Sequence, residues 1–125
     1  MPIKMEIDHA RRFVSVTADG RVVLQDVLDY FDRLVVDGGM PYPKLFDATG
    51  AKPQFSDDDM MVLGARASAY AEMEPRGPLA LVGTTEEVTS LLRRFMNLGR
   101  GQRPVMLFGN TRNAREWLAT FKDGE

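Results

Sequence analysis

The sequence predicts an α/β domain with a mostly parallel, five-stranded sheet that opens with an antiparallel N-terminal hairpin. Two observations support this fold class. The first 20 residues contain two strand-like segments, the first of which has a period-two pattern, and the remainder alternates amphipathic helical segments with short apolar runs. Strand and helix units joined in this way form right-handed crossovers, which place successive strands parallel. The expected order is ββαβαβαβα, within a single domain covering residues 1–125.

The hairpin is predicted from two strand-like segments. In the first, Ile3, Met5 and Ile7 alternate with charged residues, which creates one apolar face. The second, residues 12–18, is rich in β-branched and aromatic side chains and is expected to stop at the Asp-Gly pair 19–20.

The first helix and the third strand follow. From residue 24, apolar residues recur at i, i+3, i+4 and i+7, as in a helix with one buried face, and the glycine pair 38–39 ends this pattern. Two prolines then favour an extended connection into a short strand, residues 44–48, which the turn residues Thr49 and Gly50 are expected to close.

The second helix is predicted to begin at Ser56 and to run to about residue 74. Ser56 is a favoured capping residue, and the three aspartates at 57–59 suit the positive end of the helix dipole. Residues 79–83 form the next strand and are apolar on both faces.

A third helix, a fifth strand and a fourth helix complete the chain. Thr84 or Thr85 is expected to cap the third helix. After the strand at 104–109, Asn110 or Thr111 is expected to cap the last helix.

Composition excludes several functional classes. The net charge is −2 and there is no long run of like charges, so a nucleic-acid partner is not expected. The absence of cysteine removes disulfide and thiolate chemistry. Neither a signal peptide nor an apolar stretch long enough for a membrane span is apparent, so we expect a cytoplasmic protein with no membrane span.

No residue pattern predicts catalysis. The single histidine, His9, lies in a turn without the partners of a catalytic triad. The aspartates at 57–59 lack the spacing of a calcium loop, and the glycines at 99 and 101 lack the context of a dinucleotide loop. We therefore expect a protein that is not an enzyme and has no catalytic residue, metal or cofactor.

Polar residues collect where the parallel strands and helix starts meet. Ligands of such sheets usually bind beyond the carboxyl ends of the strands, so these residues form a candidate binding rim. The rim residues are Asp47, Thr49, Ser56, Asp57, Thr84, Thr85, Asn110 and Thr111. Turn and capping chemistry also explains each of them individually. A similar choice applies to the arginines at 93, 94, 100 and 103, which form either a solvated basic helix end or an anion site.

Two segments resemble the SpoIIAA-like group, which is related to STAS domains and to bacterial anti-sigma-factor antagonists. Residues 45–50, Leu-Phe-Asp-Ala-Thr-Gly, are similar to the family's hydrophobic strand followed by Asp-x-Ser/Thr-Gly. The closing strand 105–108 followed by residues 114–118 is similar to the family's C-terminal end. The resemblance spans nearly the whole chain and implies a SpoIIAA-like fold.

The resemblance also implies a regulatory serine that this chain lacks. In the antagonists, a serine in an Asp-Ser-Ser-Gly segment at the start of the second helix is phosphorylated. Aligned on Asp47, this chain has Asp57 at that place and Ser56 one residue earlier. A carboxylate partly imitates a phosphoserine, so two alternatives stay open: a fixed negative charge, or loss of the switch.

Two functional hypotheses follow. The first is a non-enzymatic binding or regulatory module that contacts a protein partner, or itself as a homodimer, through the rim and the start of the second helix. The alternative is a carrier of a small apolar or acyl ligand, because two strands are apolar on both faces and need cover. The candidates for that cover are the last helix, the segment 41–43, a second subunit and an apolar ligand.

Overall fold

The computed structural model describes residues 2–73, 76–98 and 103–121, and its elements follow the predicted order ββαβαβαβα. The strands are β1 (Ile3–Asp8), β2 (Phe13–Val22), β3 (Lys44–Pro53), β4 (Leu79–Val82) and β5 (Val105–Phe108). The helices are α1 (Leu24–Val36), α2 (Asp57–Met73), α3 (Glu86–Leu98) and α4 (Thr111–Leu118).

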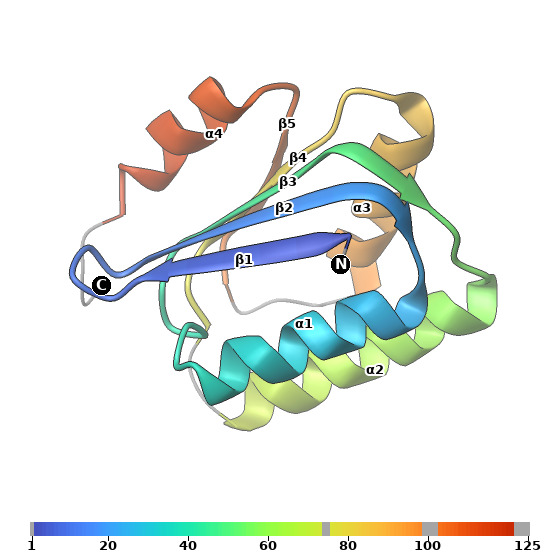
Figure 1. The fold of residues 1–125 in the computed structure, drawn as a ribbon, viewed down its shortest axis with the longest axis horizontal. Coiled ribbons are helices and arrows are strands. Elements are labelled where there is room, and N and C mark those ends of the chain that lie inside the picture. Colours follow the sequence, from blue (N-terminus) through green and yellow to red (C-terminus); the bar gives the residue numbers. More distant parts are fainter. Residues whose placement is uncertain (1, 74–75, 99–102, 122–125) are drawn as a thin grey trace.

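The strands lie in the sheet in the order β1-β2-β3-β4-β5, so each is beside its neighbour in sequence. β1 and β2 pair antiparallel, and the pairs from β2 to β5 are parallel. Helices α1 and α2 lie on one side of the sheet and α4 lies on the other (Figure 1). The predicted fold class, with its hairpin and mostly parallel sheet, is confirmed.

Strands β2 and β3 are longer than the sequence predicted. The expectation that they stop at residues 18 and 48 was wrong, because each continues by pairing with the other: Asp19 lies opposite Gly50, and Val22 lies opposite Pro53. The pairing continues through a register shift between residues 17 and 19, and Gly20 in the extended part of β2 has a positive φ. The Asp-Gly and Thr-Gly pairs are thus features within strands rather than strand ends.

The helix starts agree with the expected capping chemistry. Ser56 Oγ accepts a hydrogen bond from the backbone N–H three residues later at 3.0 Å, and that residue's carboxylate accepts one from the Ser56 N–H at 3.0 Å. Thr85, rather than Thr84, caps α3 through its Oγ1. Asn110, rather than Thr111, caps α4, accepting from the backbone N–H three residues later at 2.8 Å.

Helix α4 covers the sheet face opposite to α1 and α2. Alternate residues of β3 and β4 point to this face, as the period of a strand requires. The buried cluster there consists of Leu45, Ala80, Val82, Ala114 and Leu118. Phe108 and Trp117 pack against it with ring centroids 5.7 Å apart. Of the four candidate covers for the second apolar face, the last helix fills this role.

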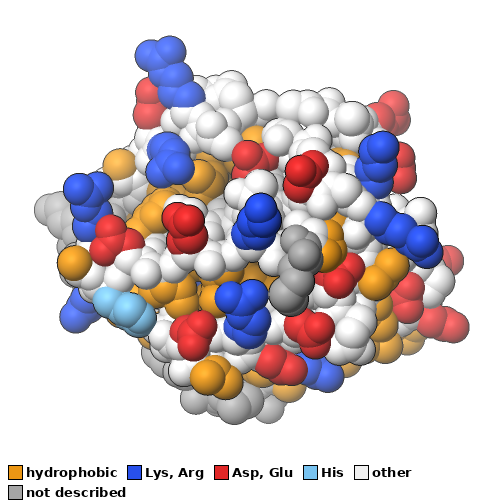
Figure 2. Space-filling view, in the orientation of Figure 1, with side chains coloured by type: hydrophobic (Ala, Val, Ile, Leu, Met, Phe, Trp, Pro, Cys, Tyr) orange, Lys and Arg blue, Asp and Glu red, His pale blue; other side chains and the backbone are white. Residues whose placement is uncertain are grey.

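The visible surface mixes charges of both signs. On the face drawn in Figure 2, acidic and basic side chains are intermingled, with hydrophobic patches between them. Within the described ranges, no helix has both the length and the apolar character that a membrane crossing requires.

Candidate functional site

Part of the predicted rim is brought together by the strand register. Asp47 lies opposite Val82, and Val82 lies opposite Phe108, so the residues that follow these strands share one edge. Asp47 Oδ1 accepts hydrogen bonds from the backbone N–H of Thr49 at 3.0 Å and from its hydroxyl at 2.7 Å. The Asp47 carboxylate is therefore already hydrogen-bonded within a local turn.

Ser56 and Asp57 are separated from that edge. Strand β3 continues six residues beyond Asp47 before the chain turns towards α2, which starts on the far side of the molecule from the β5–α4 connection (Figure 1). Asp57 Oδ1 lies 2.9 Å from Arg94 Nη2 and forms an exposed ion pair that links α2 to α3. The eight predicted residues consequently form two groups.

The remaining rim residues have local roles or are exposed. Thr85 and Asn110 are the caps described above, and Thr84 lies exposed before α3. Thr111 is the first residue of α4 and is half-buried. A ligand-binding role for the rim stays a prediction, and its hydrogen bonds are those of turns and caps.

The interior offers a second candidate site. A cavity of about 110 Å³ lies between the sheet and helices α1, α2 and α3. Its walls are almost entirely apolar, and four alanines, Ala18, Ala48, Ala51 and Ala67, leave room that larger side chains would fill. Other lining residues are Tyr30, Phe31, Phe46, Phe55, Met60, Leu63, Tyr70, Leu81, Val88, Leu91, Leu92 and Phe95.

Aromatic rings make much of the wall. The rings of Tyr30 and Phe46 meet edge to face with centroids 5.5 Å apart, and those of Phe31 and Tyr70 do so at 5.7 Å. Tyr30 and Phe31 are neighbours on α1, Phe46 comes from β3 and Tyr70 from α2. The aromatic wall thus joins the sheet to both helices and gives the cavity a defined shape.

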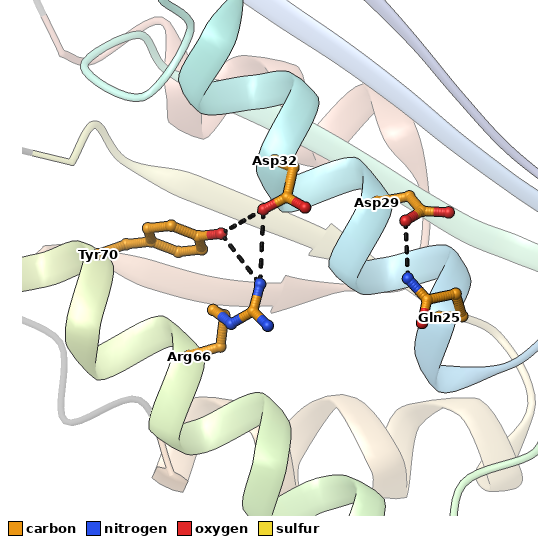
Figure 3. Close-up of polar contacts among 5 residues, drawn as sticks. All are labelled: Gln25, Asp29, Asp32, Arg66 and Tyr70. Carbon is orange, nitrogen blue, oxygen red and sulfur yellow. Dashed lines mark hydrogen bonds and ion pairs between the residues drawn. The ribbon is translucent and has the colours of Figure 1, made fainter.

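A polar contact outside the cavity holds α1 and α2 together. The Tyr70 hydroxyl donates to Asp32 Oδ1 at 2.8 Å, and Arg66 Nη1 lies 3.5 Å from the same oxygen (Figure 3). Arg66 also donates to the Tyr70 hydroxyl at 3.4 Å. Because the ring of Tyr70 lines the cavity while its hydroxyl is satisfied outside, this network fixes the wall without adding a polar group to the interior.

Three basic side chains line one part of the cavity. The first, Lys44, is 1% exposed. Its Nζ donates to the carbonyl oxygens of Met40 and Tyr42, the latter at 2.7 Å, so its charge is held by the backbone of the α1–β3 connection. Lys44 contributes mainly its aliphatic stem to the cavity wall.

The other two are Arg76 and Arg103. Arg76 precedes Gly77, where any Cβ would lie 2.3 Å from the Tyr42 carbonyl oxygen, so only glycine allows the chain to pass this close. Arg76 Nη1 donates to the Ala67 carbonyl at 3.4 Å. Arg103 stands just before β5 and also lines the cavity.

Burial lowers the pKa values of Arg76 and Arg103. Desolvation lowers the pKa of Arg103 to about 10, with the nearby charge of Arg76 acting in the same direction and Tyr30 opposing it. Desolvation also lowers the pKa of Arg76. Burial raises the pKa of Tyr30, and the charge of Arg103 acts against that rise, so the Tyr30 phenol is neutral and within electrostatic reach of Arg103.

Arg76 and Arg103 form no ion pair with an acidic side chain among the residues that the structure describes. The ion pairs there involve Arg11, Arg66, Arg94 and Arg112. Across the same ranges every fully buried polar side-chain atom has a hydrogen-bond partner. Arg103 and the Tyr30 hydroxyl make no such bond, so their polar atoms reach accessible space.

His9 and the aspartates at 57–59, which the sequence did not favour as catalytic or metal-binding residues, have local contacts in the structure. His9 Nδ1 lies 2.9 Å from the Tyr42 hydroxyl, and both groups are on the hairpin side of the molecule. In the described part of the chain, histidine and acidic residues form no group of three that is arranged to hold a metal ion. The aspartates at 57–59 act as first-turn residues of α2.

Sequence reasoning missed the interior basic group. Arg103 was weighed only with the arginines at the end of α3, either as a solvated cation or as part of an anion site there; Arg100 lies outside the described residues. The alternation of side chains along a strand could have indicated two of these positions. Lys44 shares the face of Phe46, and Arg103 shares that of Val105. Nothing local marked Arg76.

No family model matches the chain, and no curated protein matches it. Among solved structures, the chain is similar to an uncharacterized protein of the DUF3478 family from Shewanella loihica PV-4, which has a SpoIIAA-like fold. The two share 16% sequence identity over 93% of each chain, with a TM-score of 0.60. At this identity the likeness shows the fold alone, and the predicted SpoIIAA-like fold is confirmed.

Proposed function

We propose that this protein is a non-enzymatic binding protein for a small apolar ligand, which it carries in the cavity between the sheet and helices α1 to α3. The observation that supports this function is the cavity itself, with its volume of about 110 Å³ and its aromatic and aliphatic walls. Pockets for small molecules are usually concave, largely apolar and furnished with a few polar groups, and this cavity has all three properties.

The loss of folding stability that an empty cavity causes favours a functional role for this cavity. An enclosed empty cavity lowers stability by about 24 cal/mol per Å³, so a volume of about 110 Å³ corresponds to at most roughly 3 kcal/mol, because this cavity is partly open to solvent. That is a large fraction of the ~5–15 kcal/mol by which domains are usually stable. Larger side chains at Ala18, Ala48 or Ala67 would regain part of this lost stability. A ligand that fills the cavity regains it without any change of side chain.

The volume limits the size of the ligand. An engineered cavity of about 150 Å³ in another protein binds benzene. A cavity of about 110 Å³ therefore suits a single ring or a short acyl chain rather than a long-chain lipid.

Native mass spectrometry tests this proposal directly. Protein purified under gentle conditions is expected to retain a small molecule that is lost after denaturation. The Ala67→Leu variant, with a larger side chain in the cavity wall, should retain less of it. Ala65→Leu, on the exposed face of the same helix, is the matched control and should behave as wild type. Equal retention by the two variants would place the ligand elsewhere and contradict the proposal.

A second candidate function is contact with a protein partner or a second copy through α2. The observation that favours it is an exposed apolar pair near the start of α2, where Met61 is 69% exposed and Val62 is 42% exposed. Asp57 lies on the same helix and carries the charge that stands near the family's phosphoserine. Regulation by this surface would require a partner that recognises both features.

Two substitutions test the second candidate. Met61→Glu should abolish self-association or partner binding without unfolding the protein, since the side chain is exposed. Asp57→Ala should weaken partner binding if the fixed charge is recognised. A wild-type protein that stays monomeric at ~100 μM, far above the dissociation constant of a modest interface, would exclude the homodimer.

A further inference from the structure

We infer that the ligand is a small organic acid: its carboxylate is bound by Arg76 and Arg103, with the Tyr30 hydroxyl as a further donor, and its apolar part fills the cavity. This inference rests on the proposed binding function and specifies the chemical class of the ligand. The assigned residues come from three separate parts of the chain, α1, the α2–β4 connection and the α3–β5 connection, and all three line the same cavity.

The charge balance of the site supports an anion. Arg76 and Arg103 are close enough for one charge to affect the other, and no carboxylate of the described residues pairs with either. Two neighbouring cations that are partly removed from water destabilise one another unless an anion lies between them. An acidic ligand supplies that anion.

The hydrogen-bonding state of the site supports the same conclusion. Arg103 makes no hydrogen bond within the described residues, and Arg76 makes one long bond to the Ala67 carbonyl at 3.4 Å. Lys44 differs, because it already donates to two backbone carbonyls. The donors left available are guanidinium groups, which bind a carboxylate through two parallel hydrogen bonds, and a phenol that burial keeps neutral.

The position of these donors sets the polarity of the ligand. The rest of the cavity wall is apolar, so only one part of a bound molecule meets positive charge. A neutral hydrocarbon would leave both guanidinium groups without an anionic partner, and an inorganic anion would leave the apolar volume empty. A molecule with a carboxylate at one end and a short chain or single ring at the other satisfies both parts of the site.

The test compares two ligands with the same tail. Pentanoate and pentan-1-ol are titrated calorimetrically into the purified protein, after it has been unfolded and refolded to remove retained molecules. Pentanoate is expected to bind roughly tenfold more tightly or better, since hydrogen bonds to charged groups contribute more than neutral ones. Inorganic phosphate, which has no tail, is expected to bind far more weakly than pentanoate.

Three variants assign the effect to residues. Arg103→Gln and Arg76→Gln should each weaken pentanoate binding by roughly tenfold while leaving pentan-1-ol binding nearly unchanged. Arg93→Gln is the matched control, because it removes one exposed arginine of α3 and should leave both affinities unchanged. Circular dichroism confirms that each variant is folded, and the wild-type ligand comparison needs no variant at all.

The outcomes separate this inference from the proposed function. Equal affinity for the acid and the alcohol, unchanged in Arg103→Gln, would overturn the inference while supporting the cavity as an apolar site. Failure of both ligands to bind at millimolar concentration would contradict the proposed function and this inference with it. A loss of pentanoate binding in Arg93→Gln as large as in Arg103→Gln would show that overall charge, and not the cavity site, attracts the acid.

Discussion

Filling the cavity from α2 is the most informative perturbation of this structure. Ala67 is 4% exposed and lines the cavity, and Leu is nearly as good a helix former as Ala. Ala67→Leu adds three carbons beside about 110 Å³ of free volume. At about 0.8 kcal/mol for each buried methylene, full accommodation would add ~2 kcal/mol, and imperfect fit reduces this. We therefore expect the ligand-free protein to gain about 1–2 kcal/mol in its free energy of unfolding.

Urea unfolding followed by circular dichroism measures this change. Ala65→Leu is exposed on the same helix and should alter stability by less than about 0.5 kcal/mol. The denaturant dependence should be the same for all three proteins if the native states are equally compact. A loss of more than about 1 kcal/mol in Ala67→Leu, with Ala65→Leu unchanged, would mean that no usable space lies beside Ala67 and would refute the reasoning.

The remaining predictions concern four other side chains. Phe31→Ala should lower the free energy of unfolding by ~3–5 kcal/mol in urea, because Phe31 is buried in the main core; a loss below about 1 kcal/mol would contradict that placement. Ser56→Ala should lower it by ~1 kcal/mol through loss of the α2 cap, and stoichiometric phosphate on Ser56 in cell-derived protein would instead indicate a switch. Arg103→Gln should raise the stability of the ligand-free protein at pH 7 by roughly 1 kcal/mol after allowance for residual exposure. The folded-state pKa of Arg103 is lowered to about 10, so its charge opposes folding until the pH rises through that value; a loss of stability in this variant would indicate a structural role. Met61→Glu should leave stability within about 0.5 kcal/mol while abolishing any self-association seen by sedimentation equilibrium; a large loss of stability would show that Met61 is part of the core.

The fold was predictable because its signals are local. The alternation of Ile3, Met5 and Ile7, the helical spacing from Leu24 and the cap at Ser56 each depend on neighbouring residues only. The extension of β2 and β3 was not predictable in this way. The segments at 19–22 and 50–53 contain strong turn residues, and they become strands by pairing with each other across the fold.

The candidate site was predictable only in part. The rim followed from a general rule for parallel sheets, and the strand register does align Asp47 with the ends of β4 and β5. The cavity depends instead on the packing of three helices against three strands, and no single segment encodes it. Arg76 and Arg103 are 27 positions apart in the sequence and meet only when α2, α3 and the sheet are assembled.

The central claim is that the interior cavity binds the apolar part of a ligand, and its most direct test is an isotope-filtered NOE spectrum of the labelled protein with pentanoate. The account predicts cross-peaks from the pentanoate chain to side chains of the cavity wall, including Phe46, Leu63 and Phe95. It predicts none to Trp117, which packs on the opposite face of the sheet. Cross-peaks confined to Trp117 and its neighbours, or no cross-peaks at saturating pentanoate, would contradict the claim.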